Sequence, residues 1–146
     1  MTIKYIEEEL KILQKYNNIK KKKLFEVIFY QKDNGTFPVK EFVSSLDPKM
    51  RSKVYKAIQL LKDNGNKIPY PFSKHLKDGV FELRVKFSND IVRILYFFCK
   101  GKIVVLSNAF VKKTQKTPEK EIELAISRKK DYERRKLTWK VHLMNF

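Results

Sequence analysis

Three consecutive segments between residues 81 and 111 have the apolar pattern of β-strands and are separated only by short turns. In Phe81–Phe87 apolar residues alternate with charged ones, which predicts one face in a core and the other outward. Ile91–Cys99 is nearly all apolar and is typical of a central strand covered on both faces. Lys102–Val111 follows the tight turn Lys100-Gly101. Because short turns connect antiparallel neighbours, this region predicts a three-stranded meander.

Further elements precede and follow the meander. Residues 24–30 are rich in aromatic and β-branched side chains and predict a strand. Residues 37–46 and 47–64 predict two helices, the second with Asp47 as its N-cap residue. Residues 66–79 predict a loop, and a last helix is expected from residue 117 to about residue 136. We therefore predict an α+β fold, with a small antiparallel sheet of the N-terminal strand plus the meander packed against helices.

The two ends of the chain lie outside this predicted core. Residues 3–16 have apolar residues at helical spacing and predict an extra N-terminal helix. We expect its apolar face to cover the domain, and a role in docking a partner or a second copy is the alternative. The tail, residues 137–146, is apolar enough to dock, but its pattern does not define a secondary structure.

The chain is strongly basic, with 33 Lys and Arg against 16 Asp and Glu and a formal net charge of +17. Such a field favours nucleic acid, an anionic membrane surface or an acidic protein as partner. A membrane-surface protein needs a helix with a broad apolar face, and the basic C-terminal helix has only a narrow one. Phosphate binding is therefore the favoured interpretation, and no membrane partner is expected.

The sequence offers no signal for export or for a metal. It has no apolar run of about 18 residues, which excludes a transmembrane helix. Its acidic start does not resemble a secretory signal, so a cytoplasmic location is expected. The single cysteine and the distant His75 and His142 lack the spacing of metal ligands, so we predict neither a metal site nor a cofactor.

Arg93 is the most informative residue, because it interrupts the apolar central strand. A buried unpaired charge is very costly, so its guanidinium must either meet a carboxylate, such as that of Glu82, or open onto a site. Arg84 lies on the neighbouring strand, and the short turn between them allows both guanidinium groups to share one surface. Paired arginines suit phosphate recognition because the guanidinium fork matches phosphate oxygens.

A second basic region, Ser107–Pro118, runs from a strand end into a helix start. Its lysines, Lys112, Lys113 and Lys116, lie near free backbone N–H groups in an environment that suits an anion, although a solvated basic turn is the equal alternative. We also predict RNA contacts from a third group of basic residues, namely Lys74, His75, Lys77 and Lys86.

The motifs ELR, VRILYFF and FVKKTQKTP, followed by an acidic-then-basic helix, resemble the RelE/ParE superfamily of bacterial toxins. They are most similar to its phage-related, HigB-type branch. The resemblance covers about residues 24–136. It implies one RelE-like toxin domain over residues 1–146, with residues 1–20 as a helical extension and residues 137–146 as a tail.

The resemblance implies a toxin of a type II toxin–antitoxin system that cleaves mRNA on the ribosome without a metal. In such a reaction the ribose 2′-OH attacks the adjacent phosphate, so the enzyme must stabilise charge and transfer protons. The implied partners are the ribosome, its mRNA and a HigA-like antitoxin with a helix-turn-helix fold. Operator DNA would be met only through the antitoxin.

Carried over residue by residue, Arg93 matches a mid-sheet arginine that contacts the scissile phosphate, and Arg84 matches a basic position on the preceding strand. Lys112 or Lys113 falls where the family has a basic residue after the last strand. Glu82 can serve as general base, as a carboxylate does in some relatives. Lys116 can serve as general acid if neighbouring cations depress its pKa.

Two other functions fit the same sequence. A basic protein that binds RNA or DNA without cleaving it is supported by charge alone, and it predicts salt-sensitive binding. A toxin that inhibits gyrase, as in the ParE branch, is the other alternative.

Overall fold

A computed structural model describes residues 7–12, 15, 25–111 and 116–144, with residues 138–144 described by their backbone alone. Its centre is a five-stranded sheet in the order β1-β5-β4-β3-β2. The strands are β1 (Glu26–Phe29), β2 (Ser73–Lys77), β3 (Val80–Phe87), β4 (Asp90–Cys99) and β5 (Ile103–Val111). The predicted meander is confirmed, because β3, β4 and β5 pair antiparallel in chain order. The predicted central strand is β4, which lies third of five.

Two features of the sheet differ from the prediction. β1 pairs parallel to β5, with Glu26 opposite Ile103, so the sheet is mixed and not wholly antiparallel. The long helical connection after β1 permits this, since parallel strands need a crossover and not a tight turn. The predicted loop 66–79 contains β2, a lysine-rich edge strand that pairs antiparallel with β3. Its exposed polar side chains hide the apolar alternation by which strands are recognised.

The helices confirm most of the expected boundaries. They are α2 (Pro38–Ser45), α3 (Pro48–Asn64) and α4 (Glu119–Met144), with a short 3₁₀ helix η2 at Gly65–Lys67. Asp47 caps α3 as predicted, because its side chain accepts hydrogen bonds from the backbone N–H groups of Lys49 and Met50, both at 3.1 Å. α4 runs past the expected end near residue 136, so the segment left undefined at 137–144 is helical.

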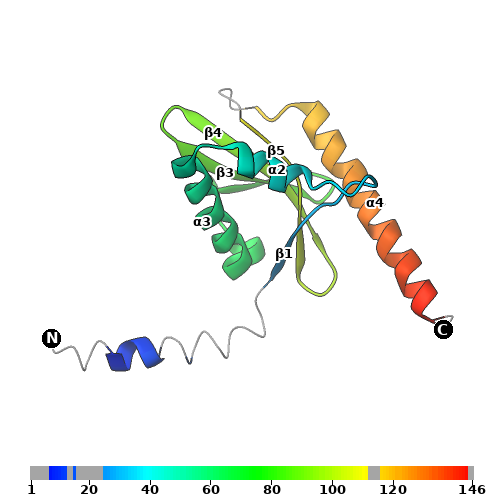
Figure 1. Ribbon diagram of the computed structural model, residues 1–146, viewed down its shortest axis with the longest axis horizontal. Coiled ribbons are helices and arrows are strands. Elements are labelled where there is room, and N and C mark those ends of the chain that lie inside the picture. The colour runs from blue at the N-terminus through cyan, green and yellow to red at the C-terminus, as the bar shows by residue number, and fades with distance from the viewer. Residues whose placement is uncertain (1–6, 13–14, 16–24, 112–115, 145–146) are drawn as a thin grey trace.

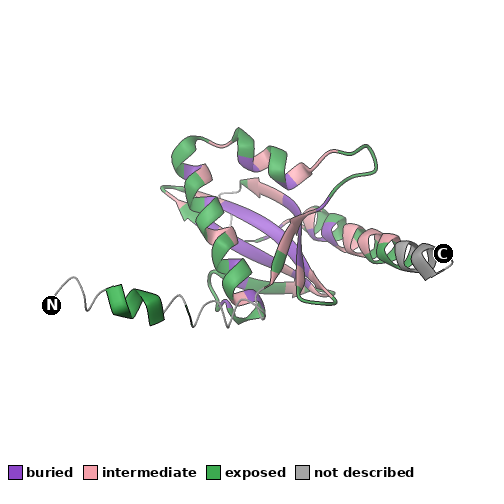
Figure 2. Cartoon of the chain, turned by 60° about the horizontal axis from the view of Figure 1, so that its bottom comes forward, coloured by how far each residue is buried: buried purple, intermediate pink, exposed green. Residues whose placement is uncertain are grey.

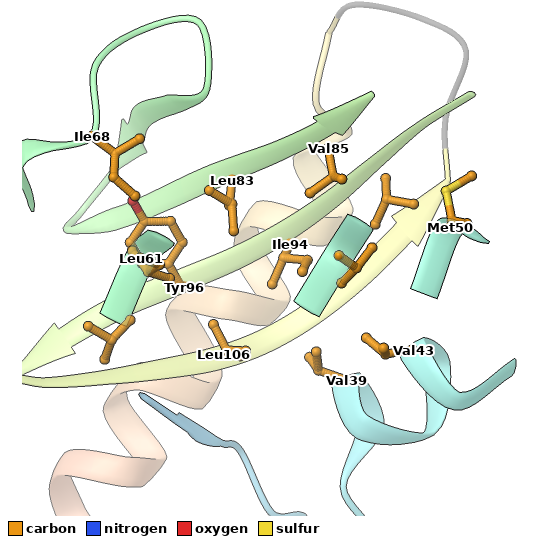
Figure 3. Packing of buried hydrophobic residues seen from close by; sticks show 13 residues of the cluster. Val39, Val43, Met50, Leu61, Ile68, Leu83, Val85, Ile94, Tyr96 and Leu106 are labelled. Carbon is orange, nitrogen blue, oxygen red and sulfur yellow. The ribbon is translucent and has the colours of Figure 1, made fainter. Parts of the chain in front are cut away.

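The sheet lies between two helical layers (Figures 1 and 2). α2 and α3 cover one face, which we call the α3 face, and α4 covers the other, the α4 face. The main core lies on the α3 face, where side chains from β3, β4 and β5 meet those of both helices, as Figure 3 shows for Leu83, Ile94, Leu106 and Val43. Smaller clusters lie under α4, around Ala125 and around Tyr132.

Gly65, the C-cap residue of α3, packs against Phe25, the residue just before β1. It has φ +56, and a Cβ atom built there would overlap the ring of Phe25. The backbone N–H of Phe25 also donates to the carbonyl of Lys62 at 3.1 Å. Glycine therefore ends the helix and lets the start of the edge strand pack closely against it.

The N-terminal helix does not cover the domain in the way its pattern suggested. Residues 7–12 and 15 are helical, and the other residues of the expected helix 3–16 lie outside the described part of the chain. Within it Leu10 and Ile12 are 56% and 67% exposed. Figure 1 shows this short helix apart from the sheet. The expectation of a covering role is therefore wrong for Leu10, whereas the other residues of that apolar face, Ile3, Ile6 and Leu13, lie outside the described part of the chain.

The N-cap of α3 gives a test of this local structure. Asp47→Ala removes the acceptor for two backbone N–H groups, so we expect the free energy of unfolding to fall by about 0.5–2 kcal/mol. Asp47→Asn keeps an acceptor and should stay within about 0.5 kcal/mol of wild type. Urea unfolding followed by circular dichroism measures both. Equal stability of the Ala and Asn variants would contradict the capping role.

Candidate functional site

The two arginines predicted for the site lie side by side on the sheet. Arg84 of β3 and Arg93 of β4 are directly opposite in the antiparallel register, so their side chains share one face. Glu82 precedes Arg84 by two positions on β3 and therefore shares that face as well. This is the α4 face, close to the point where α4 begins.

The carboxylate of Glu82 is shared by three groups. Arg84 Nε donates to Oε1 at 2.7 Å, and Arg93 Nη1 lies 3.4 Å from Oε2. The hydroxyl of Thr117, two residues before α4, donates to the same Oε2 and accepts from Arg93 Nη1 at 3.3 Å. We call these four residues the Glu82 cluster. It joins two strands to the start of α4.

Burial divides the cluster into an inner and an outer part. The side chains of Glu82 and Arg93 are 0% exposed, whereas that of Arg84 is 20% exposed. The predicted outward orientation of Glu82 is therefore wrong, because the segment leading into α4 covers this end of the strand. Of the two alternatives for Arg93, the structure has the salt bridge with Glu82. A carboxylate buried in this way and held at both oxygens is not accessible to a substrate hydroxyl, which argues against Glu82 as general base.

Further basic residues surround the exposed side of the Glu82 cluster, which itself contains two guanidinium groups and one carboxylate. Lys74 lies directly opposite Glu82 across the β2–β3 pair, and Lys86 lies two residues beyond Arg84, roughly 7 Å along the strand. Both lysines are exposed, as is Lys116, which precedes Thr117. We call Arg84, Lys74, Lys86 and Lys116 the cation face.

Not every predicted residue joins this face. His75 is paired with Phe81 and packs edge-on against its ring at 5.0 Å, on the α3 face, so the structure separates it from Lys74. Lys77 forms an exposed ion pair with Glu119 at 3.5 Å. The predicted Lys112 and Lys113 lie outside the described residues.

A second polar cluster holds the middle of α4 to the segment after β1. Tyr30 donates to Asp131 Oδ2 at 2.5 Å, and Arg135 reaches both Asp131 at 2.8 Å and Asp33 at 2.5 Å. The guanidinium carbons of Arg128 and Arg135 lie 5.1 and 5.4 Å from the centre of the Tyr30 ring. The ring is thus flanked by two cations, a favourable arrangement for its π-electrons.

These contacts shift the pKa values of the pair. Burial, with the hydrogen bond to Asp131, raises the pKa of Tyr30 to about 12. The same hydrogen bond, helped by Arg134 and Arg135, lowers the pKa of Asp131 against the opposing effect of burial. The pair therefore consists of a neutral phenol and a carboxylate through the whole physiological range.

An open pocket of about 910 Å³ lies beside this second cluster. It is lined by the segment after β1 and by the outer side of α4, including Lys32, Asn34, Leu124, Ser127 and Lys130. None of the described residues predicted for the site lines it. We therefore place the candidate site on the cation face and regard the second cluster as the attachment of α4.

The sequence gives no signal for the role of Thr117 in the Glu82 cluster or for that of Tyr30 in the attachment of α4. Thr117 was noted only as part of a helix start, and nothing in its spacing connects it with Glu82, 35 residues earlier. Tyr30 looked like the end of a strand, and its partner Asp131 lies 101 residues away. Contacts over such distances depend on the fold and have no local signal.

Among the residues that the structure describes, no group of three or more His, Cys, Asp and Glu is arranged to hold a metal ion. Nor does any described helix combine the length and apolar character needed to cross a membrane.

Comparison with known proteins gives a family. The model of the family described as phage-derived protein Gp49-like (DUF891) matches residues 41–130, from α2 to the middle of α4. The chain belongs to this family, which is associated with RelE-like toxins of toxin–antitoxin systems. Among curated proteins, no sequence matches the chain.

The Glu82 cluster should make a large contribution to stability. Glu82→Gln keeps the shape of the side chain but leaves two neighbouring cations without their shared anion, so we expect a loss of about 3–5 kcal/mol in unfolding free energy. Glu119→Gln breaks an exposed ion pair and should cost less than about 1 kcal/mol. Urea unfolding of the two variants measures the difference, and similar small losses would contradict a buried ionic cluster.

The Tyr30–Asp131 bond predicts a pH dependence. Because the pKa of Asp131 is lowered in the folded chain, its ionised form stabilises the fold above the ordinary value of 3.8, and this contribution is lost as the pH falls further. Tyr30→Phe removes the main cause. The gap in unfolding free energy between wild type and Tyr30→Phe should therefore be larger near neutral pH than at about pH 3. Tyr55→Phe, at an exposed position on α3, is the control, and a constant gap for Tyr30→Phe would contradict the assignment.

Proposed function

We propose that this protein is the toxin of a type II toxin–antitoxin system and that it cleaves mRNA on the ribosome without a metal. The observation that supports this most is the cation face, an excess of positive charge around a partly exposed arginine in a member of a toxin-associated family. The products would be a fragment with a cyclic phosphate and a fragment with a free 5′-OH. A HigA-like helix-turn-helix antitoxin would neutralise the toxin, with operator DNA met only through it.

In this proposal Arg84 contacts the scissile phosphate. Its Nε is held by Glu82 at 2.7 Å, so the guanidinium has a fixed position and needs little rearrangement as charge develops on the phosphate oxygens. Arg93, fully buried behind it, is a positioning residue that fixes Glu82 from the other side. This revises the direct phosphate contact expected for Arg93 from the resemblance.

Proton transfer would come from the basic segment before α4. Lys116 is exposed and adjacent to Thr117, which ties this segment to the Glu82 cluster. Lys116 is our proposed general acid for the leaving 5′-oxygen, the proton of the attacking 2′-OH passes to water, and Lys112 and Lys113 are proposed to contact the phosphates. Lys74 and Lys86 would guide the backbone of the mRNA by charge.

Arg84 is the position at which to test this function. Arg84→Ala should lower mRNA cleavage by roughly 10²–10³-fold and relieve growth arrest, because a donor to the developing charge is removed. Arg84→Lys keeps the charge without the fork and should recover only part of the activity. Lys49→Ala, at an exposed position on α3, should behave as wild type. Primer extension on cellular mRNA after induction, with immunoblots for expression, measures cleavage.

The same experiments can also favour the two alternative functions, gyrase inhibition and RNA binding without cleavage. Growth arrest with intact transcripts would contradict the nuclease and favour gyrase inhibition, and salt-sensitive RNA binding without cleavage would favour a binding protein. Arg93→Ala is a poorer probe, because the loss of a fully buried partner of Glu82 will also lower stability.

A further inference from the structure

An exposed aromatic side chain lies next to Arg84. The segment before β2 contains Phe72, whose side chain is 57% exposed. The backbone N–H of Arg84 donates to the carbonyl of Phe72 at 2.8 Å. This bond joins Phe72, the turn residue just before β2, to Arg84, next to the Ser73–Leu83 pair at the end of the β2–β3 register.

Phe72 lies in the turn that leads into β2, where its backbone N–H donates to the carbonyl of Pro69 at 3.1 Å. Ser73 points to the α3 face, where its hydroxyl lies 2.5 Å from that of the buried Tyr96. Because successive side chains of a strand alternate, Lys74 points to the opposite face, together with Arg84. The exposed ring of Phe72 belongs to the residue just before this strand, whose carbonyl is bonded to the backbone of Arg84.

This position needs a reason, because a large ring exposed at a charged site gains little from burial. A phenyl ring beside a guanidinium matches the chemistry of single-stranded RNA, in which a base follows each phosphate. A phosphate on Arg84 would leave an adjoining base near the exposed ring of Phe72, because the backbones of the two residues are joined by a hydrogen bond of 2.8 Å.

We propose that Phe72 stacks on an RNA base adjoining the phosphate held by Arg84 and so positions the nucleotide for cleavage. This inference rests on the proposed function for its substrate. It makes Phe72 a positioning residue that acts through the base. Stacking on a phenyl ring does not depend on which base is present, because every base has a π-face.

The test compares side chains that stack with one that only fills space. In cleavage of mRNA on purified ribosomes, Phe72→Leu should lower kcat/KM by roughly 5- to 150-fold, the range that corresponds to a lost stacking contact. Phe72→Tyr should retain activity, because a phenol ring stacks as well. Melting temperatures should stay near that of wild type in both variants, since the ring is exposed. Wild-type cleavage by Phe72→Leu would overturn the proposal.

A binding measurement separates this proposal from the nuclease function. Phe72→Trp places a fluorophore at the site, and the emission of its indole should be quenched by a single-stranded hexaribonucleotide at low salt. The wild-type chain, with its single tryptophan Trp139, gives the background. Quenching without any cleavage would overturn the nuclease function and support base stacking. Absence of quenching would overturn base stacking even if wild-type chains cleave mRNA, and quenching by an acidic peptide instead of RNA would indicate a protein partner.

Discussion

The buried carboxylate of Glu82 is the interaction on which the rest of this structure depends. A fully buried anion is tolerated only with close partners, and here two arginines and a hydroxyl satisfy it from three different elements. The central strands supply the arginines and the start of α4 supplies Thr117. The same contacts that make burial possible therefore hold α4 on the sheet. They also fix the side chain of Arg84 at the edge of the covered region, where it is partly exposed.

The sequence defines the elements well where a periodic pattern is strong. The alternation in 81–87, the apolar run in 91–99 and the Asp-Pro start of α3 predict β3, β4 and α3 within one or two residues. β2 was missed, although Asp78-Gly79 is a strong hairpin signal, and both residues have the positive φ values that such a turn requires. The parallel pairing of β1 has no local signal, because the direction of an edge strand depends on how the intervening helices pack.

The sequence predicted which residues share the face of the candidate site, but it did not predict which of them are buried. The spacing of Arg84 and Arg93 on neighbouring strands correctly placed both guanidinium groups on one face. Their relative exposure could not be predicted, because it depends on Thr117, which is brought to the sheet by the packing of α4. For the same reason Glu82 was expected on the surface and lies in the interior. Phe72 was missed because its segment was interpreted as a loop, and only pairing with β3 shows its neighbour.

Several contacts join residues that are far apart in the chain, so they can form only after the later residue has been synthesised. β1 is made early, but its partner among the described strands is β5, and the hydrogen-bond partner of Tyr30 lies 101 positions later in the chain. Glu82 likewise lacks its hydroxyl donor until Thr117 has been made. A chain interrupted before Thr117 has both arginines but lacks the hydroxyl that joins Glu82 and Arg93 to the start of α4. A cell that makes this protein therefore meets the assembled cation face only after translation has passed Thr117, the residue that completes the Glu82 cluster.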